Sequence, residues 1–312
     1  MQTLLDVIAP IFGVIAIGFV AARGGLVSTA TAEGLSSFVF RFAIPALLFR
    51  TLAHRTLPDA LPWGLVAAFY GGVFATFAIG WAVGGGGMAL RGAERALFAF
   101  SGAFGNVVLL GVPLALTAFG DAAALPTFMV VSFHSLLLMP TVTVLLELAR
   151  GHERPLRDIP ASVARGVLGN PIVVALIAGS VWSLAAWPLG GPVDAVLELL
   201  ARAALPCALF AMGASLARLP IGSSLRPVGP VVVLKTLLCP ALVGLLAGPV
   251  LGLDPLVGAV AVLMAAQPTG INPYLFAQRY GQGVALTAAA VVVSTAFSVV
   301  TLSLLLAWQA VD

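Results

Sequence analysis

Charged residues are scarce in this chain. They make up 9% of its 312 residues, whereas hydrophobic residues make up 61%. A soluble domain of this length could not cover so much apolar surface with polar groups, so the composition excludes an ordinary soluble protein and predicts one that lies in a lipid bilayer. The formal net charge is only +3, and most charges lie in short connections between apolar runs. We therefore expect no nucleic-acid partner, because the basic surface that binds phosphate is missing.

Cysteines and catalytic motifs are equally few. The two cysteines, Cys207 and Cys239, lie inside apolar runs and are expected to be buried thiols rather than a disulfide. The stretch Gly213–Leu216 weakly resembles the nucleophile turn of rhomboid proteases, but the later histidine base is missing, since His152 is the last histidine. HExxH and paired intramembrane aspartates are missing too. The sequence thus predicts no enzyme, no cofactor and no metal site.

What the chain does have is an internal repeat. Shifted by 161 residues, the segment 41–49 (RFAIPALLF) aligns with the segment 202–210 (RAALPCALF), and the same shift pairs Asn106 with Gln267. Near the C-terminus the shift becomes 162, as expected for two diverged copies of one unit. A repeat this long and almost wholly apolar is typical of membrane transporters built from two halves.

Apolar runs of roughly 20 residues, the length that a helix needs to cross about 30 Å of hydrocarbon, recur along the chain. We place ten spans near residues 4–22, 34–53, 62–83, 96–119, 125–149, 168–187, 193–217, 228–250, 256–279 and 285–309. Two repeats of five spans must enter the membrane from opposite sides, so the repeats are inverted. The predicted fold is an all-α polytopic membrane protein, with a first repeat at 1–150, a cytoplasmic connection at 151–167 and a second repeat at 168–312.

Basic residues set the predicted orientation. The connections after spans 1, 3, 5, 7 and 9 hold ten arginines, whereas the opposite face holds only Arg50 and Arg55. By the positive-inside rule the face with ten is cytoplasmic, which puts both termini on the outer face. The ten are Arg23, Arg91, Arg95, Arg150, Arg154, Arg157, Arg165, Arg218, Arg226 and Arg279.

Spans four and nine are interrupted at mid-span by helix breakers and amides. Span four reads SGAFGNVVLLGVP from Ser101 to Pro113, and span nine reads QPTGINPY from Gln267 to Tyr274. Proline lacks an N–H and glycine weakens a helix, so backbone groups become free where lipid cannot satisfy them. Each break alone could be a packing kink. Their matched positions in inverted repeats instead favour a substrate site near the bilayer midplane, where half-helix N-termini suit an anion.

Several segments carry a family resemblance. They are Phe42–Phe49 in span two, Gly105-Asn106 with Gly111–Leu114 in span four, Lys235-Thr236 with Pro240 in span eight, and Pro268–Asn272 with Ala277–Gly281 in span nine. In their order and spacing the chain resembles, over nearly its whole length, the auxin efflux carrier family, whose bacterial members include proteins described as malonate and malate permeases. The architecture is similar to that of sodium/proton antiporters and bile-acid symporters.

The resemblance implies how the spans are organised. Spans 1, 2, 6 and 7 would form a scaffold, and spans 3–5 and 8–10 a mobile transport domain that moves like an elevator. It also implies a homodimer formed through the scaffold and a place in the bacterial inner membrane. The substrate would bind where spans four and nine cross.

The predicted substrate-binding residues lie at that crossing. They are Gly105, Asn106, Pro113, Gln267, Pro268, Thr269, Asn272 and Pro273. Gln267 is included because it is the repeat partner of Asn106. Neither broken segment contains Asp or Glu, so a small organic anion fits the crossing better than a metal ion does.

Ionisable residues inside other spans are costly and are therefore candidates for function. His134 in span five could couple proton movement to transport, or it could be a neutral core histidine. Lys235 in span eight could attract a carboxylate, or it could be paired internally or reach toward the membrane surface. Arg279 could guide an anion toward the inner mouth, or it could anchor the end of span nine.

The remaining charges inside spans have structural interpretations. Arg41 and Arg202 are expected to bond carbonyl groups that the following prolines leave free. Glu198 could also pair with Arg202, because the two are four residues apart on one helix. Glu147, near the inner end of span five, is expected to be an interfacial charge rather than a proton carrier.

Together these patterns predict a secondary transporter of small organic anions such as malonate or malate. Two alternatives keep the architecture. One is a sodium-coupled symporter of the bile-acid-carrier type, whose oxygen ligands would come from amides, Thr269 and carbonyl groups. The other is a channel. The predicted partners are the organic anion and the bilayer.

Overall fold

The computed structural model describes residues 2–54, 62–149, 169–220 and 226–309, with side chains from residue 8 onward. In these ranges the chain is helical, and its one β feature is an isolated bridge between Gly105 and Thr269. The predicted connection 151–167, with His152, Arg154, Arg157 and Arg165, lies outside the described residues. Arg55 and Arg150 lie outside them too. The all-α class is confirmed.

The helices of the first half follow the predicted spans closely. They are α1 (Gln2–Arg23), then α2 (Thr29–Phe38), η1 (Val39–Ala43) and α3 (Ile44–Ala53) in one stretch, α4 (Trp63–Gly86), α5 (Gly92–Ala103), η2 (Val107–Gly111), α6 (Val112–Phe119), η3 (Gly120–Ala123) and α7 (Ala124–Ala149). Span four is thus interrupted between α5 and η2, as the glycines and Pro113 predicted.

The second half repeats this order. Its helices are α9 (Pro171–Leu184), α10 (Gly191–Leu216), then α11 (Val228–Val233), η5 (Leu234–Leu238), α12 (Cys239–Leu245) and η6 (Leu246–Val250) in one stretch, α13 (Pro255–Ala265), α14 (Asn272–Tyr280) and α15 (Val284–Gln309). Span nine is interrupted between α13 and α14. Among the described residues, six helical stretches are long and apolar enough to cross a membrane. The protein is therefore built as a multi-pass membrane protein.

Wide helical turns precede several prolines. The π-helical turns η1, η2 and η5 each end two residues before a proline, namely Pro45, Pro113 and Pro240. Because proline has no N–H and its ring clashes with the preceding turn, the helix widens there instead of keeping its regular ladder. The FAIPALLF and LKTLLCP segments therefore bend their spans without breaking them.

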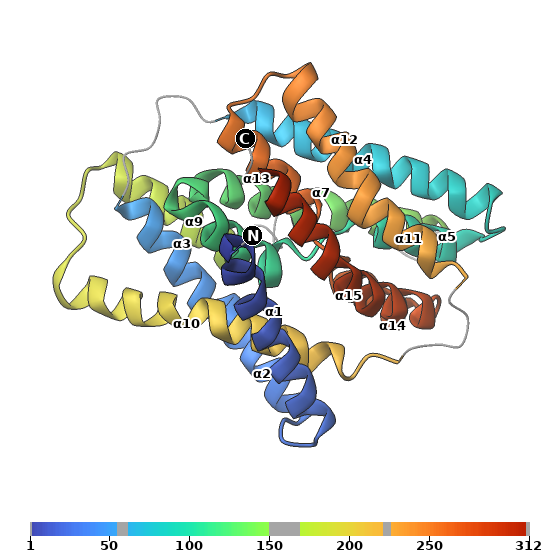
Figure 1. Cartoon of the computed structure of the whole chain (residues 1–312), viewed down its shortest axis with the longest axis horizontal. Coiled ribbons are helices and arrows are strands. Elements are labelled where there is room, and N and C mark those ends of the chain that lie inside the picture. Colours follow the sequence, from blue (N-terminus) through green and yellow to red (C-terminus); the bar gives the residue numbers. More distant parts are fainter. Residues whose placement is uncertain (1, 55–61, 150–168, 221–225, 310–312) are drawn as a thin grey trace.

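The helices fall into two groups. In Figure 1, α1, α2, α3, α9 and α10 gather on the left and lower side, whereas α4, α5, α11 and α12 lie at the upper right with α14 and α15 beside them. Within the first group, α1 packs on α10 and α9 packs on α3. These contacts are reciprocal in the repeat, because span one meets span seven and span six meets span two.

Glycines allow the closest of these contacts. A Cβ atom built on Gly213 would lie 1.9 Å from the carbonyl oxygen of Ile15, and one on Gly18 would lie 2.3 Å from that of Phe210. Helices in membranes associate through such small residues, because lipid tails offer no hydrophobic drive for association. The α1–α10 pair is therefore a fixed element of the fold.

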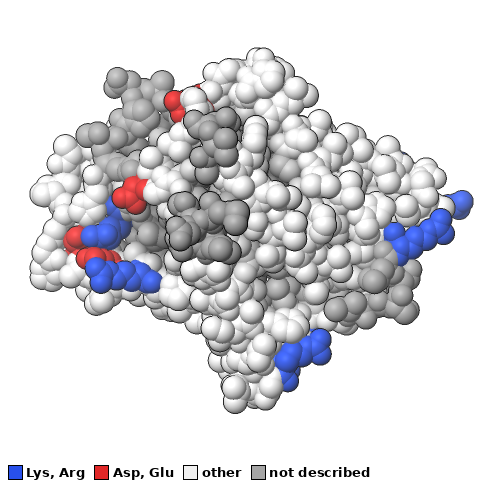
Figure 2. Space-filling view, viewed as in Figure 1, with Lys and Arg blue, Asp and Glu red and all other residues white. Residues whose placement is uncertain are grey.

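Charges are sparse on the surface as well. Figure 2 shows a broad uncharged face, with charged side chains gathered at its edges. One such group joins α3 to α10: Arg50 donates to Asp194 at 2.6 and 3.2 Å, and Arg202 donates to Glu198 at 2.5 Å. The predicted pairing of Glu198 with Arg202 is confirmed. The prediction that Arg41 and Arg202 bond freed carbonyl groups was wrong, because within the described residues neither side chain bonds a carbonyl group.

Two other sequence expectations can be compared with the structure. Cys207 and Cys239 are free thiols, with Cys239 buried and Cys207 partly buried. The prediction for Glu147 was wrong: only 7% of it is exposed, and its carboxylate accepts a 2.7 Å hydrogen bond from the Tyr280 hydroxyl. This hydrogen bond joins the end of α14 to the end of α7, a contact that the position of Glu147 in span five alone could not reveal.

Candidate functional site

The two broken segments cross and pair with each other. The Asn106 N–H donates to the Pro268 carbonyl at 2.8 Å, and the Gly270 N–H donates to the Phe104 carbonyl at 2.9 Å. Backbone groups that the helix breaks set free thus satisfy one another where neither lipid nor water could do so. The sequence predicted the two breaks, and the structure brings them together.

Thr269 stabilises the crossing through buried hydrogen bonds. Its side chain is fully buried, and its hydroxyl donates to the Ser101 carbonyl at 2.9 Å. Its own N–H donates to the Ser294 hydroxyl at 3.0 Å. Thr269 therefore joins the end of α5 to α15, and its hydroxyl points into the protein. Sequence reasoning found Thr269 but missed Ser101 and Ser294, which lie far from it in the chain.

Asn106 stands at the junction of the two helix groups. Its Oδ1 accepts the Leu109 N–H at 3.2 Å, so it caps η2, while its Nδ2 approaches the Met212 sulfur of α10 at 3.2 Å. Thioether sulfur is a weak acceptor, and a polar ligand could therefore compete for this amide. Nothing in the sequence marked Met212 as a contact of Asn106.

Lys235 is buried behind the crossing. Only 1% of it is exposed, and its ammonium donates to the carbonyl of Ala265, the last residue of α13, at 2.5 Å. A Cβ atom on Gly105 would lie 3.1 Å from the Lys235 Cε. A cation is favourable at a helix C-terminus, where carbonyl groups lack partners. Of the readings that the sequence left open, the geometry matches internal pairing.

His134 supports the crossing from α7. Its Nε2 accepts the Gly105 N–H at 3.2 Å, and its ring lies 4.4 Å from that of Phe104, centroid to centroid. Its Nδ1 is buried without a hydrogen-bond partner among the described residues. An Nε2 that accepts a hydrogen bond carries no proton, so the imidazole shown here is neutral.

Gln267, the repeat partner of Asn106, is fully buried. Its Nε2 donates to the Leu263 carbonyl at 2.9 Å, and its Oε1 has no partner in the part of the chain that the structure describes. A Cβ atom on Gly111 would lie 3.3 Å from the Gln267 Cγ. Gln267 therefore packs inside the crossing.

A cavity of about 530 Å³ lies beside the crossing, between α2, α10, η2 and α14. Of the residues that the sequence nominated for substrate binding, Asn106 is the one that lines it. Its walls are formed by Thr29, Ala32, Glu33, Ser36, Asn106, Leu109, Met212, Ser215, Leu216, Arg218, Leu219, Ile271, Tyr274, Leu275, Gln278 and Val291. The volume falls in the usual range of small-molecule sites, about 300–1,000 Å³.

Unpaired backbone donors lie close to the cavity, and of their residues Ile271 is the one that lines it. The N–H groups of Val107 and Val108, which open η2, and of Ile271 and Asn272, at the start of α14, have no hydrogen-bond partner within the described residues. They belong to the N-termini of the two half-helices, where the helix dipole is positive. Such termini bind anions.

The other nominated residues do not reach the cavity. Pro113 and Pro273 are buried in the first turns of α6 and α14. Asn272 opens α14 and is partly buried, and Arg279 is exposed at the far end of that helix. The described residues contain no group of His, Cys, Asp and Glu that could hold a metal ion.

The fold and the site define a class: a multi-pass membrane protein whose two interrupted helices cross beside a small-molecule cavity. The sequence pattern of the membrane transport protein family matches residues 3–306. The chain therefore belongs to this family, the auxin efflux carrier family. It is a membrane transporter and not an enzyme.

Named relatives agree with this assignment. The "Putative malonate transporter" of Rhizobium meliloti (strain 1021) is 30% identical over 98% of this chain and 96% of its own. The "Auxin efflux carrier component 8" of Arabidopsis thaliana is 24% identical over 87% of this chain and 88% of its own. The "Lysosomal cholesterol signaling protein" of Mus musculus is 44% identical over 41 residues, which are 13% of this chain and 5% of that protein.

Proposed function

We propose that this protein is a secondary transporter of small organic anions, and that the anion binds in the cavity beside the crossing. The observation that carries the proposal is the set of unpaired N–H groups at the starts of η2 and α14, which lie close in the chain to Asn106 and Ile271, two residues that line the cavity. These donors need no protonation to bind a carboxylate, and an anion at two helix N-termini gains from both dipoles.

The charges around the cavity fit a small carboxylate. Arg218, which follows α10, and Glu33, in α2, are the charged residues among its described lining, and neither belongs to the crossing. The name of the Rhizobium meliloti relative favours malonate as the first substrate to test. With no carboxylate among the residues that form the crossing, an anion meets no like charge there.

The membrane topology in this proposal is ten spans in two inverted repeats. The reciprocal packing of α1 on α10 and of α9 on α3 supports it. The cavity lining includes the start of α2 and the end of α10, which the arginine distribution places on the cytoplasmic side. The structure would then be open to the cytoplasm, with both termini on the outer face of a bacterial inner membrane.

An elevator-type movement is part of the proposal, and the position of the cavity supports it. Its walls come from α2 and α10 on one side and from η2 and α14 on the other. If the second group carries the anion across the membrane, the contact between Asn106 and Met212 must break and form again. A weak amide–thioether contact suits such a repeated step.

Sodium coupling is less well supported than anion transport alone. The Lys235 ammonium already donates a hydrogen bond to the carbonyl of Ala265 at the end of α13, and thereby occupies an oxygen that a sodium ion could otherwise bind. Sodium also prefers several oxygen ligands, and the Thr269 hydroxyl is committed to Ser101. Uptake that requires sodium would establish this alternative.

Uptake into proteoliposomes tests the proposal. We expect saturable, protein-dependent uptake of radiolabelled malonate or malate that falls at least about tenfold in Asn106→Ala, a loss of about 1.4 kcal/mol. Asn170→Ala is the matched control, because Asn170 caps α9 through the Ile172 N–H but lies outside the cavity. Absence of flux across a panel of mono- and dicarboxylates with folded protein would refute the proposal.

A homodimer through the scaffold, spans 1, 2, 6 and 7, is also part of the proposal. Arg41 lies at the middle of the stretch Thr29–Ala53 and is exposed, and Arg202, at the middle of α10, has a side chain that is 74% exposed. Arginine at mid-span is costly when it faces acyl chains. A second copy of the chain would cover both arginines.

A further inference from the structure

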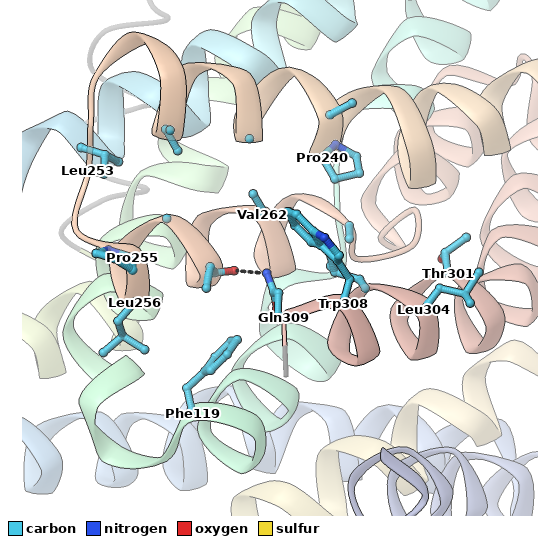
Figure 3. A pocket seen from close by; sticks show the side chains of 18 of the residues that line it. Phe119, Pro240, Leu253, Pro255, Leu256, Val262, Thr301, Leu304, Trp308 and Gln309 are labelled. Carbon is cyan, nitrogen blue, oxygen red and sulfur yellow. Dashed lines mark hydrogen bonds between the residues drawn. The ribbon is translucent and has the colours of Figure 1, made fainter. Parts of the chain in front are cut away.

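A second cavity, of about 830 Å³, lies between α12, η6, α13 and α15. It is shown in Figure 3, where Pro240 and Thr301 lie toward one end and Leu253, Pro255 and Leu256 toward the other. Among the described residues, no charged side chain lines it. It therefore cannot be a second site for the transported anion, which would lose its hydration there without any compensating charge.

The polar groups in this groove are few and mostly turned inward. Thr236 donates to the Val232 carbonyl at 2.7 Å, and Gln309 donates to the Ala259 carbonyl at 3.3 Å (dashed in Figure 3). The remaining lining is almost wholly apolar, with the hydroxyl of Thr301 and the Oε1 of Gln309 buried and unpartnered in the described chain. The groove thus selects an apolar ligand.

The groove opens where hydrocarbon would surround it. Leu237, Leu304 and Trp308 line it and are 46%, 65% and 64% exposed, on helices apolar enough to span a membrane. Trp308 is at the end of α15, where an interfacial tryptophan meets lipid headgroups. From Thr301 to Gln309 the groove follows about 12 Å of helix, close to the roughly 15 Å of hydrocarbon in one leaflet.

We propose that this groove binds one acyl chain of a membrane phospholipid, with the headgroup near Trp308. The groove exists because small residues line it: a Cβ atom on Gly248 or on Gly258 would meet nothing within 4 Å. Its inner end reaches Ala266, the residue before Gln267 of the crossing. The bound chain therefore packs behind the crossing and moves with the helices that form it.

The experiment uses the full chain in vesicles of phosphatidylethanolamine and phosphatidylglycerol that contain a phospholipid with a photoreactive diazirine in its acyl chain. Cross-linked peptides are mapped by mass spectrometry. We expect labelling to concentrate on 236–259 and 301–309. Filling the groove in Gly258→Leu, or independently in Gly248→Leu, should lower this labelling about fivefold, the ratio given by a loss of about 1 kcal/mol of packing.

Gly13→Leu on α1 is the matched control, because a Cβ atom on Gly13 also meets nothing within 4 Å and Gly13 does not line the groove. Its labelling pattern should equal that of the wild type. Labelling that is uniform over all spans, or unchanged in both groove variants, would overturn the proposal. So would labelling of the groove by a photoreactive sterol but not by the phospholipid, or cross-links there between two copies of the chain.

Discussion

His134 is a buried imidazole whose role depends on one hydrogen bond. Because its Nε2 accepts the Gly105 N–H, an acceptor must stay at this place, and protonation of Nε2 would break the bond. We expect His134→Gln to keep uptake and His134→Phe to destabilise the protein by about 1–3 kcal/mol, the cost of an unpartnered buried N–H. Thermal unfolding and uptake check both variants.

The same variants decide between the two roles that the sequence left open for His134. If it positions Gly105, the response of uptake to a proton gradient is the same in His134→Gln and in the wild type. A variant that transports normally without a gradient but no longer responds to one would instead identify His134 as the coupling group.

Lys235 is the single lysine of the chain, and its ammonium holds the Ala265 carbonyl behind the crossing. We expect Lys235→Met to lower uptake about tenfold, a loss of about 1.4 kcal/mol, because the carbonyl at the end of α13 loses its partner and the anion loses a nearby positive charge. The readout is initial uptake rate against substrate concentration in proteoliposomes. Wild-type uptake by a folded Lys235→Met protein would refute a role at the site.

Of the individual residues at the site, the sequence predicted only some. Asn106 could be found because its repeat partner and the neighbouring glycine mark a helix break. Met212 and Ser294 could not, because an ordinary apolar side chain and a serine inside a span carry no signal for the contact they make. Pairing of Lys235 with Ala265, 30 residues apart, depends on how α13 lies against η5.

The contact between α1 and α10 leaves no room for larger side chains at Gly18 and Gly213. We expect Gly213→Ala to lower the melting temperature by about 5 °C, because its Cβ would lie 1.9 Å from the Ile15 carbonyl oxygen and the helices must separate. Gly13→Ala on the same α1 is the control, since its Cβ meets nothing within 4 Å. Melting is followed by loss of monodisperse protein on heating in detergent.

Equal melting temperatures for the two glycine variants would mean that α1 and α10 can separate without cost. The sequence could not have shown which of the two glycines tolerates a larger side chain, because both lie in apolar helices. It did predict where helices bend and break, since proline and glycine act locally on the backbone through which they run. The contact between α1 and α10 depends instead on residues far apart in the chain, as Gly213 and Ile15 illustrate.

For the whole molecule, the two-part design was readable because the repeat preserves whole segments, such as RFAIPALLF and RAALPCALF, at one shift. The reciprocal packing of spans one and six on spans seven and two agrees with that design. What the sequence could not provide is the cavity beside the crossing. Its walls join the start of α2, the end of α10 and the two broken segments, which come together only when both halves are assembled.

The exposed arginines at mid-span give the last prediction. If a second copy covers Arg41 and Arg202, replacing both by leucine removes polar contacts at the interface and should weaken the dimer about 30-fold, or about 2 kcal/mol. If they face lipid instead, the leucines fit the bilayer better than arginine and the oligomeric state does not change. Mass photometry of the protein in lipid nanodiscs over a range of concentrations separates the two cases. Arg23→Leu is the control, because Arg23 ends α1, where an arginine can reach water by itself.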